Sequence, residues 1–342
     1  MPDTNNIIIT FGELMLRLES QPGQRLQHTT SFRPFFGGAE ANVSVLLSQL
    51  GMNVCFVSAL PDNPIGQSAI NALRCFGTDT QFVQRNGNRI GIYYTENGNS
   101  IRYSKVVYDR KGSSFASLGP GSIDWDKILE NANWFHWTGI SPALTQQSAN
   151  LCLEALKAAK KKGITISADM NYRSTLWDYG KHPSEIMPEL LSYCDIITGD
   201  LDTIEIYFGI KIKSGLPVEE KFRLCAESLL KNLPALKVLA MSFRGSNDSQ
   251  LPTYQAAVSL NSEIAFSSLY TISQTIDRIG SGDAFMGGLI YGLSQKQSAQ
   301  ELINSATACA ILKHSIEGDF TIITKEEMEQ FIKTGPVNRV IR

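Results

Sequence analysis

Short apolar runs and longer amphipathic segments alternate along most of the chain. Runs rich in β-branched or aromatic residues predict buried strands within residues 6–10, 53–60, 133–139, 164–173, 194–200 and 236–243. Apolar positions at helical spacing predict helices within 37–51, 65–77, 148–163 and 218–233, and the C-terminal quarter is expected to be mainly helical. This alternation favours an α/β fold, with a mostly parallel central sheet and helices on both faces.

Two polar, turn-rich stretches, residues 15–36 and 88–110, do not follow this alternation. Prolines and a glycine interrupt the first, and the second has strand-like segments on either side of "NGNS", residues 97–100. We expect the two stretches to form a small β-strand lid that projects from the main sheet and closes over a ligand. The chain shows no repeat, low-complexity segment or obvious interdomain linker, so residues 1–342 are expected to form a single domain.

Composition narrows the class of protein without naming its chemistry. The 342 residues are 43% hydrophobic and 19% charged, as in ordinary globular proteins. A formal net charge of −2 gives no electrostatic reason to expect a nucleic-acid or membrane partner. The six cysteines are scattered without a C-x-x-C pair, which indicates reduced thiols. With no apolar run of membrane-spanning length and no apolar leader, a cytoplasmic location is expected.

Residues 277–288 read "DRIGSGDAFMGG" and raise a chemical question. Gly280, Ser281 and Gly282 are small residues that let a ligand approach the backbone, and an amphipathic helix follows them. The first-turn N–H groups of such a helix bind anions, phosphate above all. An acid there, Asp283, repels phosphate unless the reaction needs a base at that place. The alternative is an ordinary acidic residue in the first turn of a helix.

A second glycine stretch, "FFGGAEAN", covers residues 35–42. It is neither G-x-G-x-x-G nor G-x-x-x-x-G-K-[ST], which argues against a dinucleotide fingerprint and against a Walker-type P-loop. A tight turn before a helix is one interpretation. The other is that its backbone N–H groups, beside Glu40 and Asn42, form the floor of a site for a polyhydroxylated ligand.

These two stretches resemble the two signatures of the PfkB (ribokinase-like) family of sugar kinases. Arg278 departs from the small residue or proline usual in the second signature, and the same departure is typical of the 2-keto-3-deoxygluconate kinase branch. Six further segments are similar to that branch: "GELMLR" (12–17), "LPDNPIG" (60–66), "SKVVYDR" (104–110), "FHWTGISPAL" (135–144), "DMNYRSTLW" (169–177) and "LKHSIEGDF" (312–320). The resemblance covers nearly the whole chain and implies a ribokinase-like fold.

The resemblance also implies roles for individual residues. Asp283 would be the general base, and the turn of Gly280, Ser281, Gly282 and Asp283 would be the anion hole. The substrate hydroxyls would be held by Gly38, Ala39, Glu40, Ala41 and Asn42. From the lid, Tyr93, Tyr108 and Arg110 would contact substrate, and Arg173 would bind a carboxylate. The ATP-binding residues would be Ser242, Arg244, Gly245, Gly280, Ser281 and Gly282.

A guanidinium suits a carboxylate because it offers paired hydrogen bonds. We expect Arg110 and Arg173 both to direct an otherwise unpartnered charge into the pocket, which a sugar acid would satisfy and a neutral sugar would not. A surface ion pair is the alternative for either arginine.

Two segments depart from the family pattern. The magnesium-ordering N-x-x-E motif should fall near "TGDLDTIE", residues 198–205, where Asp200, Asp202 and Glu205 are the available acids. The nucleotide-side stretch "SFRGSNDS", residues 242–249, lacks the T-x-G-x-x-G of many relatives. The metal-binding residues therefore stay unassigned.

The resulting interpretation is an ATP- and Mg²⁺-dependent kinase that converts 2-keto-3-deoxy-D-gluconate into its 6-phosphate. The alternatives are a kinase of a neutral sugar such as fructose or ribose, and a sugar- or nucleotide-binding homologue with impaired turnover; a Rossmann dehydrogenase is less well supported. The expected partners are the small sugar acid and ATP. The resemblance also implies a homo-oligomer assembled through the lid.

Overall fold

The computed structural model describes residues 6–98 and 102–336. The last residues of "NGNS", Asn99 and Ser100, lie outside the described residues. The strands are β1 (Ile7–Phe11), β2 (Met15–Ser20), β3 (Phe32–Gly37), β4 (Asn53–Leu60), β5 (Val83–Arg85), β6 (Gly91–Glu96), β7 (Lys105–Asp109), β8 (Ala132–Thr138), β9 (Thr165–Asp169), β10 (Ile196–Gly199), β11 (Val238–Ser246), β12 (Pro252–Leu260), β13 (Glu263–Phe266) and β14 (Tyr270–Thr271). The helices are α1 (Ala39–Gln49), α2 (Pro64–Cys75), α3 (Trp125–Ile128), α4 (Gln146–Lys161), α5 (Pro183–Leu191), α6 (Leu201–Phe208), α7 (Val218–Asn232), α8 (Ser281–Ser294), α9 (Ala299–Lys313) and α10 (Lys325–Thr334), with a 3₁₀ turn at Ser141–Ala143.

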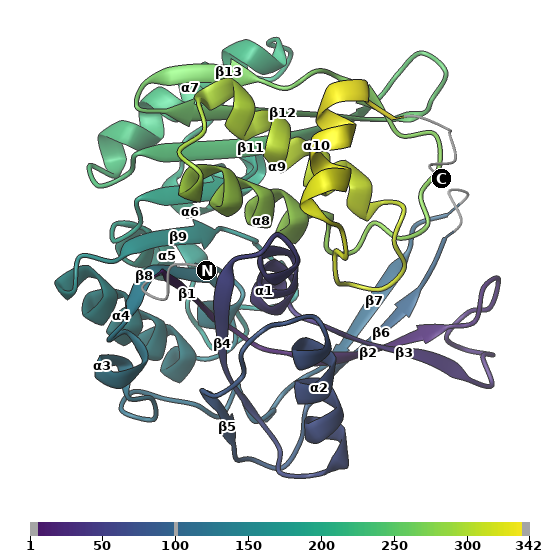
Figure 1. Cartoon of the computed structure of the whole chain (residues 1–342), viewed down its shortest axis with the longest axis vertical. Coiled ribbons are helices and arrows are strands. Elements are labelled where there is room, and N and C mark those ends of the chain that lie inside the picture. The colour runs from purple at the N-terminus through teal and green to yellow at the C-terminus, as the bar shows by residue number, and fades with distance from the viewer. Residues whose placement is uncertain (1–5, 99–101, 337–342) are drawn as a thin grey trace.

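A large, mostly parallel sheet forms the body of the molecule (Figure 1). Its strand order is β13-β12-β11-β10-β9-β8-β1-β4-β5, with β14 paired to β12. The strands from β11 to β5 are parallel to their neighbours, and β12 is antiparallel to β11, β13 and β14. This confirms the expected α/β class, and the carboxyl ends of the parallel strands meet at one edge, where ligands bind in such sheets.

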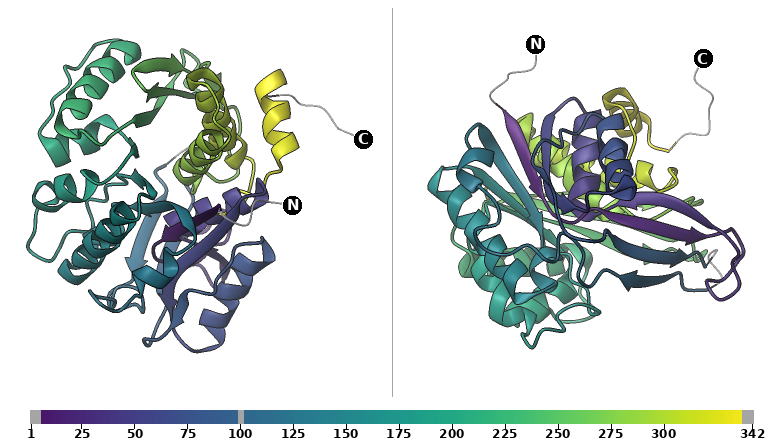
Figure 2. Two further views of the ribbon diagram at one scale, coloured as in Figure 1. Left: turned by 60° about the vertical axis from the view of Figure 1, so that its left-hand side comes forward. Right: turned by 90° about the horizontal axis from the view of Figure 1, so that it is seen from below.

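Helices cover both faces of this sheet (Figure 2). One core lies among α4, α5, α7 and the strands, a second lies among α1, α8, α9 and the opposite face, and a third joins α1, α2 and β4. Two glycines let α8 approach its neighbours: a Cβ on Gly287 would lie 2.7 Å from Leu46 Cδ2, and one on Gly288 would lie 2.8 Å from the Cα of Ala306. This close packing fixes the start of α8, which carries Asp283.

A second sheet of four strands, in the order β3-β2-β6-β7, projects from the body (Figures 1 and 2). The sequence predicts a lid in this part of the chain, and its strands come from the two stretches outside the helix–strand alternation. Strand β2 pairs with β6 in parallel, so that Arg17 lies opposite Tyr93. The inner side chains of this sheet face the carboxyl edge of the large sheet.

Strands β12, β13 and β14 were not predicted, and they extend the large sheet beyond β11. Among the described residues, no helix is both long enough and apolar enough to cross a membrane. Five of the six cysteines are buried, and Cys75 is exposed.

Candidate active site

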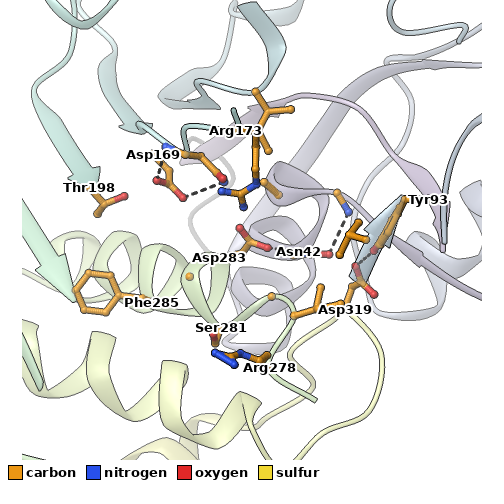
Figure 3. Close-up of a pocket in the computed structure, with 18 of the residues that line it drawn as sticks. Asn42, Tyr93, Asp169, Arg173, Thr198, Arg278, Ser281, Asp283, Phe285 and Asp319 are labelled. Carbon is orange, nitrogen blue, oxygen red and sulfur yellow. Dashed lines mark hydrogen bonds between the residues drawn. The ribbon is translucent and has the colours of Figure 1, made fainter. Parts of the chain in front are cut away.

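A pocket of about 580 Å³ opens between the lid sheet and the carboxyl edge of the large sheet (Figure 3). Its lining brings together segments that are far apart in the sequence: the start of α1, the lid strands, the ends of β9 and β10, strand β11 and the turn before α8. Of the residues predicted for the site, the lining contains Gly38, Ala39, Asn42, Tyr93, Tyr108, Arg110, Arg173, Ser242, Arg244, Gly280, Ser281, Gly282 and Asp283.

The turn before α8 consists of small residues in a conformation that requires glycine. Gly280 has a left-handed φ of 87°, and a Cβ there would lie 2.3 Å from the carbonyl oxygen of Asp319, so only glycine fits. Helix α8 begins at Ser281, whose N–H donates to the carbonyl of Arg278 at 3.2 Å. The N–H groups of Gly282 and Asp283 lie in the first helical turn, where no earlier helical carbonyl exists to accept them. They are therefore the turn's available donors for an anion.

Asp283 lies in this first turn and directs its carboxylate into the pocket (Figure 3). The Nδ2 of Asn42, on α1, donates a hydrogen bond of 2.6 Å to its Oδ2. Burial raises the pKa of Asp283 to about 6, while the Asn42 hydrogen bond and the charge of Arg173 act in the opposite direction. A carboxylate in this state is ionised near neutral pH and is basic enough to accept a proton.

Asp169 is a second pocket carboxylate, which sequence reasoning missed as a site residue. It ends β9 and accepts hydrogen bonds from the backbone N–H and the amide of Asn171, at 3.1 and 3.2 Å. Burial and then the charge of Asp283 raise its pKa to about 7, against the attraction of Arg173. Its place at the end of a parallel strand was the available signal.

The two predicted arginines have different surroundings. Arg173 is exposed, lies in the segment after β9 and faces Asp169 and Asp283 across the pocket (Figure 3). Arg110 is only 5% exposed, and its Nε donates to the Glu13 carboxylate at 2.9 Å, with a second bond from its Nη2. The expectation of two unpartnered guanidinium groups is therefore wrong for Arg110, because Glu13 neutralises its charge.

The lid contributes one buried tyrosine and one half-buried tyrosine. Tyr93 lines the pocket and donates a short hydrogen bond to Asp319, whereas Tyr94 points to the opposite face of the strand and contacts the ring of Phe32. This confirms the prediction that only one of the adjacent tyrosines lines the site. Tyr108 packs against Tyr93, with ring centroids 6.0 Å apart.

Asp319 was also missed. It follows the glycine of "EGDF" and lies behind the turn of Gly280, where its carboxylate accepts from Arg17 at 2.9 Å and from Tyr93. Arg17, on lid strand β2, also forms ion pairs with Glu19 at 2.9 Å and Asp277 at 2.7 Å. The lid is thus joined to the segment that carries the turn at Gly280.

Three of the predicted site residues do not line the pocket: Glu40, Ala41 and Gly245. Glu40 belongs to α1, and its side chain is buried. Its Oε1 accepts hydrogen bonds from the N–H and the hydroxyl of Thr138 at 3.1 and 2.7 Å. Burial raises its pKa to about 7. The carboxyl of Glu40 therefore joins α1 to β8, because the helical turn points it inward rather than toward the pocket.

Strand β11 and the turn before α8 form another side of the pocket. Arg244 Nη2 donates to the hydroxyl of Ser281 at 3.1 Å, which places a cation beside the turn. Of the three acids near the expected magnesium motif, Asp200 lines the pocket and caps α6, while Glu205 pairs with Lys211 at 3.6 Å. Within residues 6–98 and 102–336, no cluster of three or more acidic, histidine or cysteine side chains could hold a metal by itself.

Comparison with known proteins agrees with this geometry. The chain is 29% identical to the 2-dehydro-3-deoxygalactonokinase of Haloferax volcanii, over 96% of this chain and 97% of that protein. The structure of a 2-dehydro-3-deoxygluconokinase from Thermotoga maritima matches with a TM-score of 0.90 and 38% identity, over 96% of this chain and 98% of that one. A putative 2-keto-3-deoxygluconate kinase from Enterococcus faecalis matches with a TM-score of 0.90 and 25% identity, over 98% and 99% of the two chains. Residues 6–322 match the model of the pfkB family carbohydrate kinases, and the chain belongs to that family.

Proposed function

We propose that this protein phosphorylates a 2-keto-3-deoxy sugar acid, 2-keto-3-deoxy-D-gluconate, at its terminal hydroxyl, with ATP as donor. The observation that carries the proposal is the meeting of three features in one pocket. Asp283 lies beside the anion turn of Gly280, and the exposed guanidinium of Arg173 faces the same space. A base, an anion hole and a carboxylate-binding cation are the parts that this reaction needs.

Asp283 accepts the proton of the terminal hydroxyl as that oxygen attacks the γ-phosphorus. A new O–P bond forms, the bond to the β-phosphate oxygen breaks, and ADP leaves with the sugar acid 6-phosphate. The N–H groups of Gly282 and Asp283, with Arg244 beside Ser281, would stabilise the charge that gathers on the transferred group. Asn42 holds the base in the orientation in which it accepts the proton.

Arg173 binds the substrate carboxylate in this proposal because, of the two arginines predicted to contact substrate, it is exposed in the pocket, whereas Arg110 is paired with Glu13. Arg110 instead forms part of the pocket wall on the lid side, where Glu13 neutralises it. Gly38, Ala39 and Asn42 at the start of α1, with Tyr93 and Tyr108 from the lid, would surround the sugar hydroxyls.

PfkB kinases use ATP with Mg²⁺. The pocket residues suit both groups, because the turn at Gly280 and Arg244 can hold phosphates, and Mg²⁺ commonly takes one or two carboxylates together with phosphate oxygens. Of the three acids near the expected magnesium motif, Asp200 would serve the metal in this proposal, because it lines the pocket. Bound Mg²⁺ would neutralise charge on the phosphates during transfer.

The experiment that tests the function is a coupled phosphorylation assay with ATP and Mg²⁺. The panel contains 2-keto-3-deoxygluconate, 2-keto-3-deoxygalactonate, fructose and ribose, because the relatives include kinases named for both sugar-acid epimers. We expect the highest kcat/KM for 2-keto-3-deoxygluconate. A preference for fructose or ribose would instead support a neutral-sugar kinase, and binding of ATP without turnover of any sugar would support a turnover-impaired homologue.

The proposal also covers the domain organisation, the closure of the lid, the cellular location and the assembly of the protein. We infer that residues 1–342 act as one kinase domain, that the lid closes over bound sugar acid, and that use of ATP places the enzyme in the cytoplasm. Lid strand β7 exposes Val106 and Val107 by 45% and 50%, which suits a homo-oligomer formed through the lid. Light scattering on the purified protein, with and without Val107→Lys, tests that assembly; a monomer in both samples would contradict it.

A further inference from the structure

The segment that carries Arg173 contains a strained aromatic residue. Trp177 has a left-handed φ of 67°, whereas the other described non-glycine residues with positive φ all have polar side chains. A bulky residue rarely adopts this conformation and keeps it only where the surrounding structure imposes it. Trp177 is not among the residues that line the pocket, and the reaction described above gives it no role. Its strain therefore needs another explanation.

Both ends of this segment are fixed to the backbone and side chains around the carboxyl edge of the large sheet. At its start, the carbonyl oxygen of Met170 accepts a hydrogen bond of 2.9 Å from the hydroxyl of Tyr207, and a Cβ on Gly139 would lie only 2.2 Å from the same oxygen. At its end, the N–H of Trp177 donates to the carbonyl oxygen of Ala143 at 3.0 Å. Residues 171–177, here called the arginine loop, therefore run between two fixed points.

The indole of Trp177 supplies the packing that holds the end of the arginine loop. It is half-buried against the core on the side of α4 and α5, and its ring centroid lies 5.9 Å from that of Tyr179. The hydroxyl of Tyr179 donates to the carbonyl oxygen of Pro142 at 2.8 Å, so both aromatic residues are held against the turn after β8. The indole N–H is buried and finds no hydrogen-bond acceptor among the described residues. Packing of the ring, rather than a polar contact of the side chain, therefore keeps Trp177 in place.

Arg173 lies within the arginine loop, between two residues with left-handed backbones. Before it, Asn171 has a φ of 38° and donates to the carboxylate of Asp169 through its N–H and its amide, and Trp177 follows it. The exposed guanidinium of Arg173 donates to the carbonyl oxygen of its neighbour Tyr172 at 3.0 Å. Because that acceptor belongs to the same loop, this bond moves with the loop. The direction of Arg173 therefore depends on the path of the backbone between its two bends.

We propose that Trp177 is a positioning residue for acid specificity, which holds the arginine loop in its left-handed bend and so directs Arg173 at the carboxylate of the substrate. It acts through the backbone and touches neither substrate. Asparagine adopts a left-handed φ more readily than most residues, whereas a β-branched residue is strongly disfavoured there, so the ring and the bend can be removed separately. The proposal rests on the sugar-acid kinase function above, which gives Arg173 its carboxylate.

The test compares three substitutions of Trp177 in the full-length protein. Trp177→Phe keeps an aromatic ring and loses an N–H that has no described acceptor, so its kinetics should resemble those of wild type. Trp177→Val removes the ring and disfavours the bend, so the KM for the sugar acid should rise about 10-fold, while kcat and the KM for ATP change less than about threefold. Trp177→Asn tolerates the bend without the ring and should lie between the two. Tyr193→Val removes a half-buried ring from the same core outside the loop, and it should leave the KM for the acid unchanged.

A double-mutant cycle shows whether Trp177 acts through Arg173. In an Arg173→Ala background, Trp177→Val should raise the KM for the acid less than about twofold further, because the group that it positions is gone. A second full loss in that background would show a role independent of Arg173 and would overturn the proposal. A wild-type KM for the acid in Trp177→Val, or an equal rise in the KM for ATP, would overturn it too. If Trp177→Val does not fold, Trp177→Asn takes its place in the cycle.

Failure of the function itself would be visible separately. Wild-type turnover on the sugar panel is measured first. If wild type phosphorylates no sugar acid, the function proposal fails, and hydrogen exchange of the ligand-free protein then tests the positioning role alone. Faster exchange within residues 171–177 in Trp177→Val, with wild-type exchange in Trp177→Phe, would support a loop held by the ring. Unchanged exchange in Trp177→Val would overturn it.

Discussion

The side-chain amide of Asn42 donates a hydrogen bond of 2.6 Å to the carboxylate of Asp283, although 241 positions separate the two residues in the chain. The bond connects the start of α1 with the start of α8, the two glycine-rich stretches of the sequence. A donor to the ionised form of a carboxylate lowers its pKa, while burial raises it. For Asp283 the effect of burial is the larger of the two, and its pKa is raised to about 6.

Removal of the proposed base, Asp283, should nearly abolish turnover. Asp283→Asn keeps the size of the side chain but cannot accept the hydroxyl proton, so kcat should fall by ~10²–10⁴ while the affinity for ATP changes little. Steady-state kinetics with calorimetric ATP binding measure both. Asp202→Asn removes an exposed acid from the first turn of another helix, α6, and serves as the matched control. Near-normal turnover in Asp283→Asn would contradict the assignment.

The pH dependence of kcat should report the same carboxylate. Because Asp283 must be ionised to act, kcat should decrease as the pH falls through about 6. Asn42→Ala removes a hydrogen bond that lowers the pKa, so the acidic limb should move to higher pH, while kcat on the alkaline plateau is less affected. Rate profiles between pH 5 and 9 measure the shift. A limb at the same pH in both proteins would show that another group controls it.

Substrate selectivity should depend on Arg173. Arg173→Ala should raise the KM for the keto-deoxy acid by about one to two orders of magnitude, because a charge-assisted hydrogen bond contributes roughly 1.5–3 kcal/mol. The preference for the acid over fructose should narrow, and the KM for ATP should stay nearly constant. Arg244→Ala is the reciprocal control, expected to raise the KM for ATP instead. Equal losses on acid and neutral sugar would contradict a carboxylate contact.

Substitution of Arg110 should mainly lower the free energy of unfolding. Arg110→Ala leaves the Glu13 carboxylate, 4% exposed, without its guanidinium partner, and breaking such a buried pair costs about 3–5 kcal/mol. Arg110→Ala combined with Glu13→Gln should recover part of that loss, since no unpaired charge remains. Urea unfolding measures the free energies, with Arg173→Ala as a control that leaves them nearly unchanged. A neutral effect of Arg110→Ala would mean that Glu13 finds another partner.

The two glycines of the anion turn should respond differently to a methyl group. Gly280→Ala forces an L-residue into a left-handed φ and against the carbonyl of Asp319, so it should lower stability by about 2 kcal/mol or more and reduce turnover. At Gly282, a Cβ meets nothing within 4 Å, so Gly282→Ala should fold normally. Its methyl group projects where the phosphate is expected, and the KM for ATP should rise. Similar stability losses at both positions would contradict this account of the turn.

The sequence predicts the parts of the site that depend on local order. A small-residue turn, an acid and an amphipathic helix are adjacent in the chain, and the structure places Gly280, Ser281 and Asp283 as that order implies. Alternation along β6 likewise distinguishes Tyr93 from Tyr94. These inferences hold because helical and strand periodicity fix where neighbouring side chains point.

Pairings between distant segments could not be predicted in the same way. The partner of Arg110 is Glu13, 97 positions earlier, and no local pattern shows that a buried carboxylate would neutralise it. Asp319 lies in the site because the loop after α9 returns to the turn at Gly280. Glu40 sits in a signature segment, yet the turn of α1 directs it toward Thr138 and away from the pocket. Strand β12 was missed because its small and polar residues give a weak pattern, and β13 and β14 were missed because they span only four and two residues.

Arg17 is bonded to Asp319 across 302 positions of the chain. A ribosome delivers the lid strand long before the carboxylate that anchors it. Helices α1, α2 and α4 can assemble on their strands while synthesis continues, but the guanidinium of Arg17 lacks Asp277 and Asp319 until those residues have emerged. A nascent chain therefore cannot complete the pocket before Asp319 is made, and the cell gains kinase activity from this protein only after that point in its synthesis.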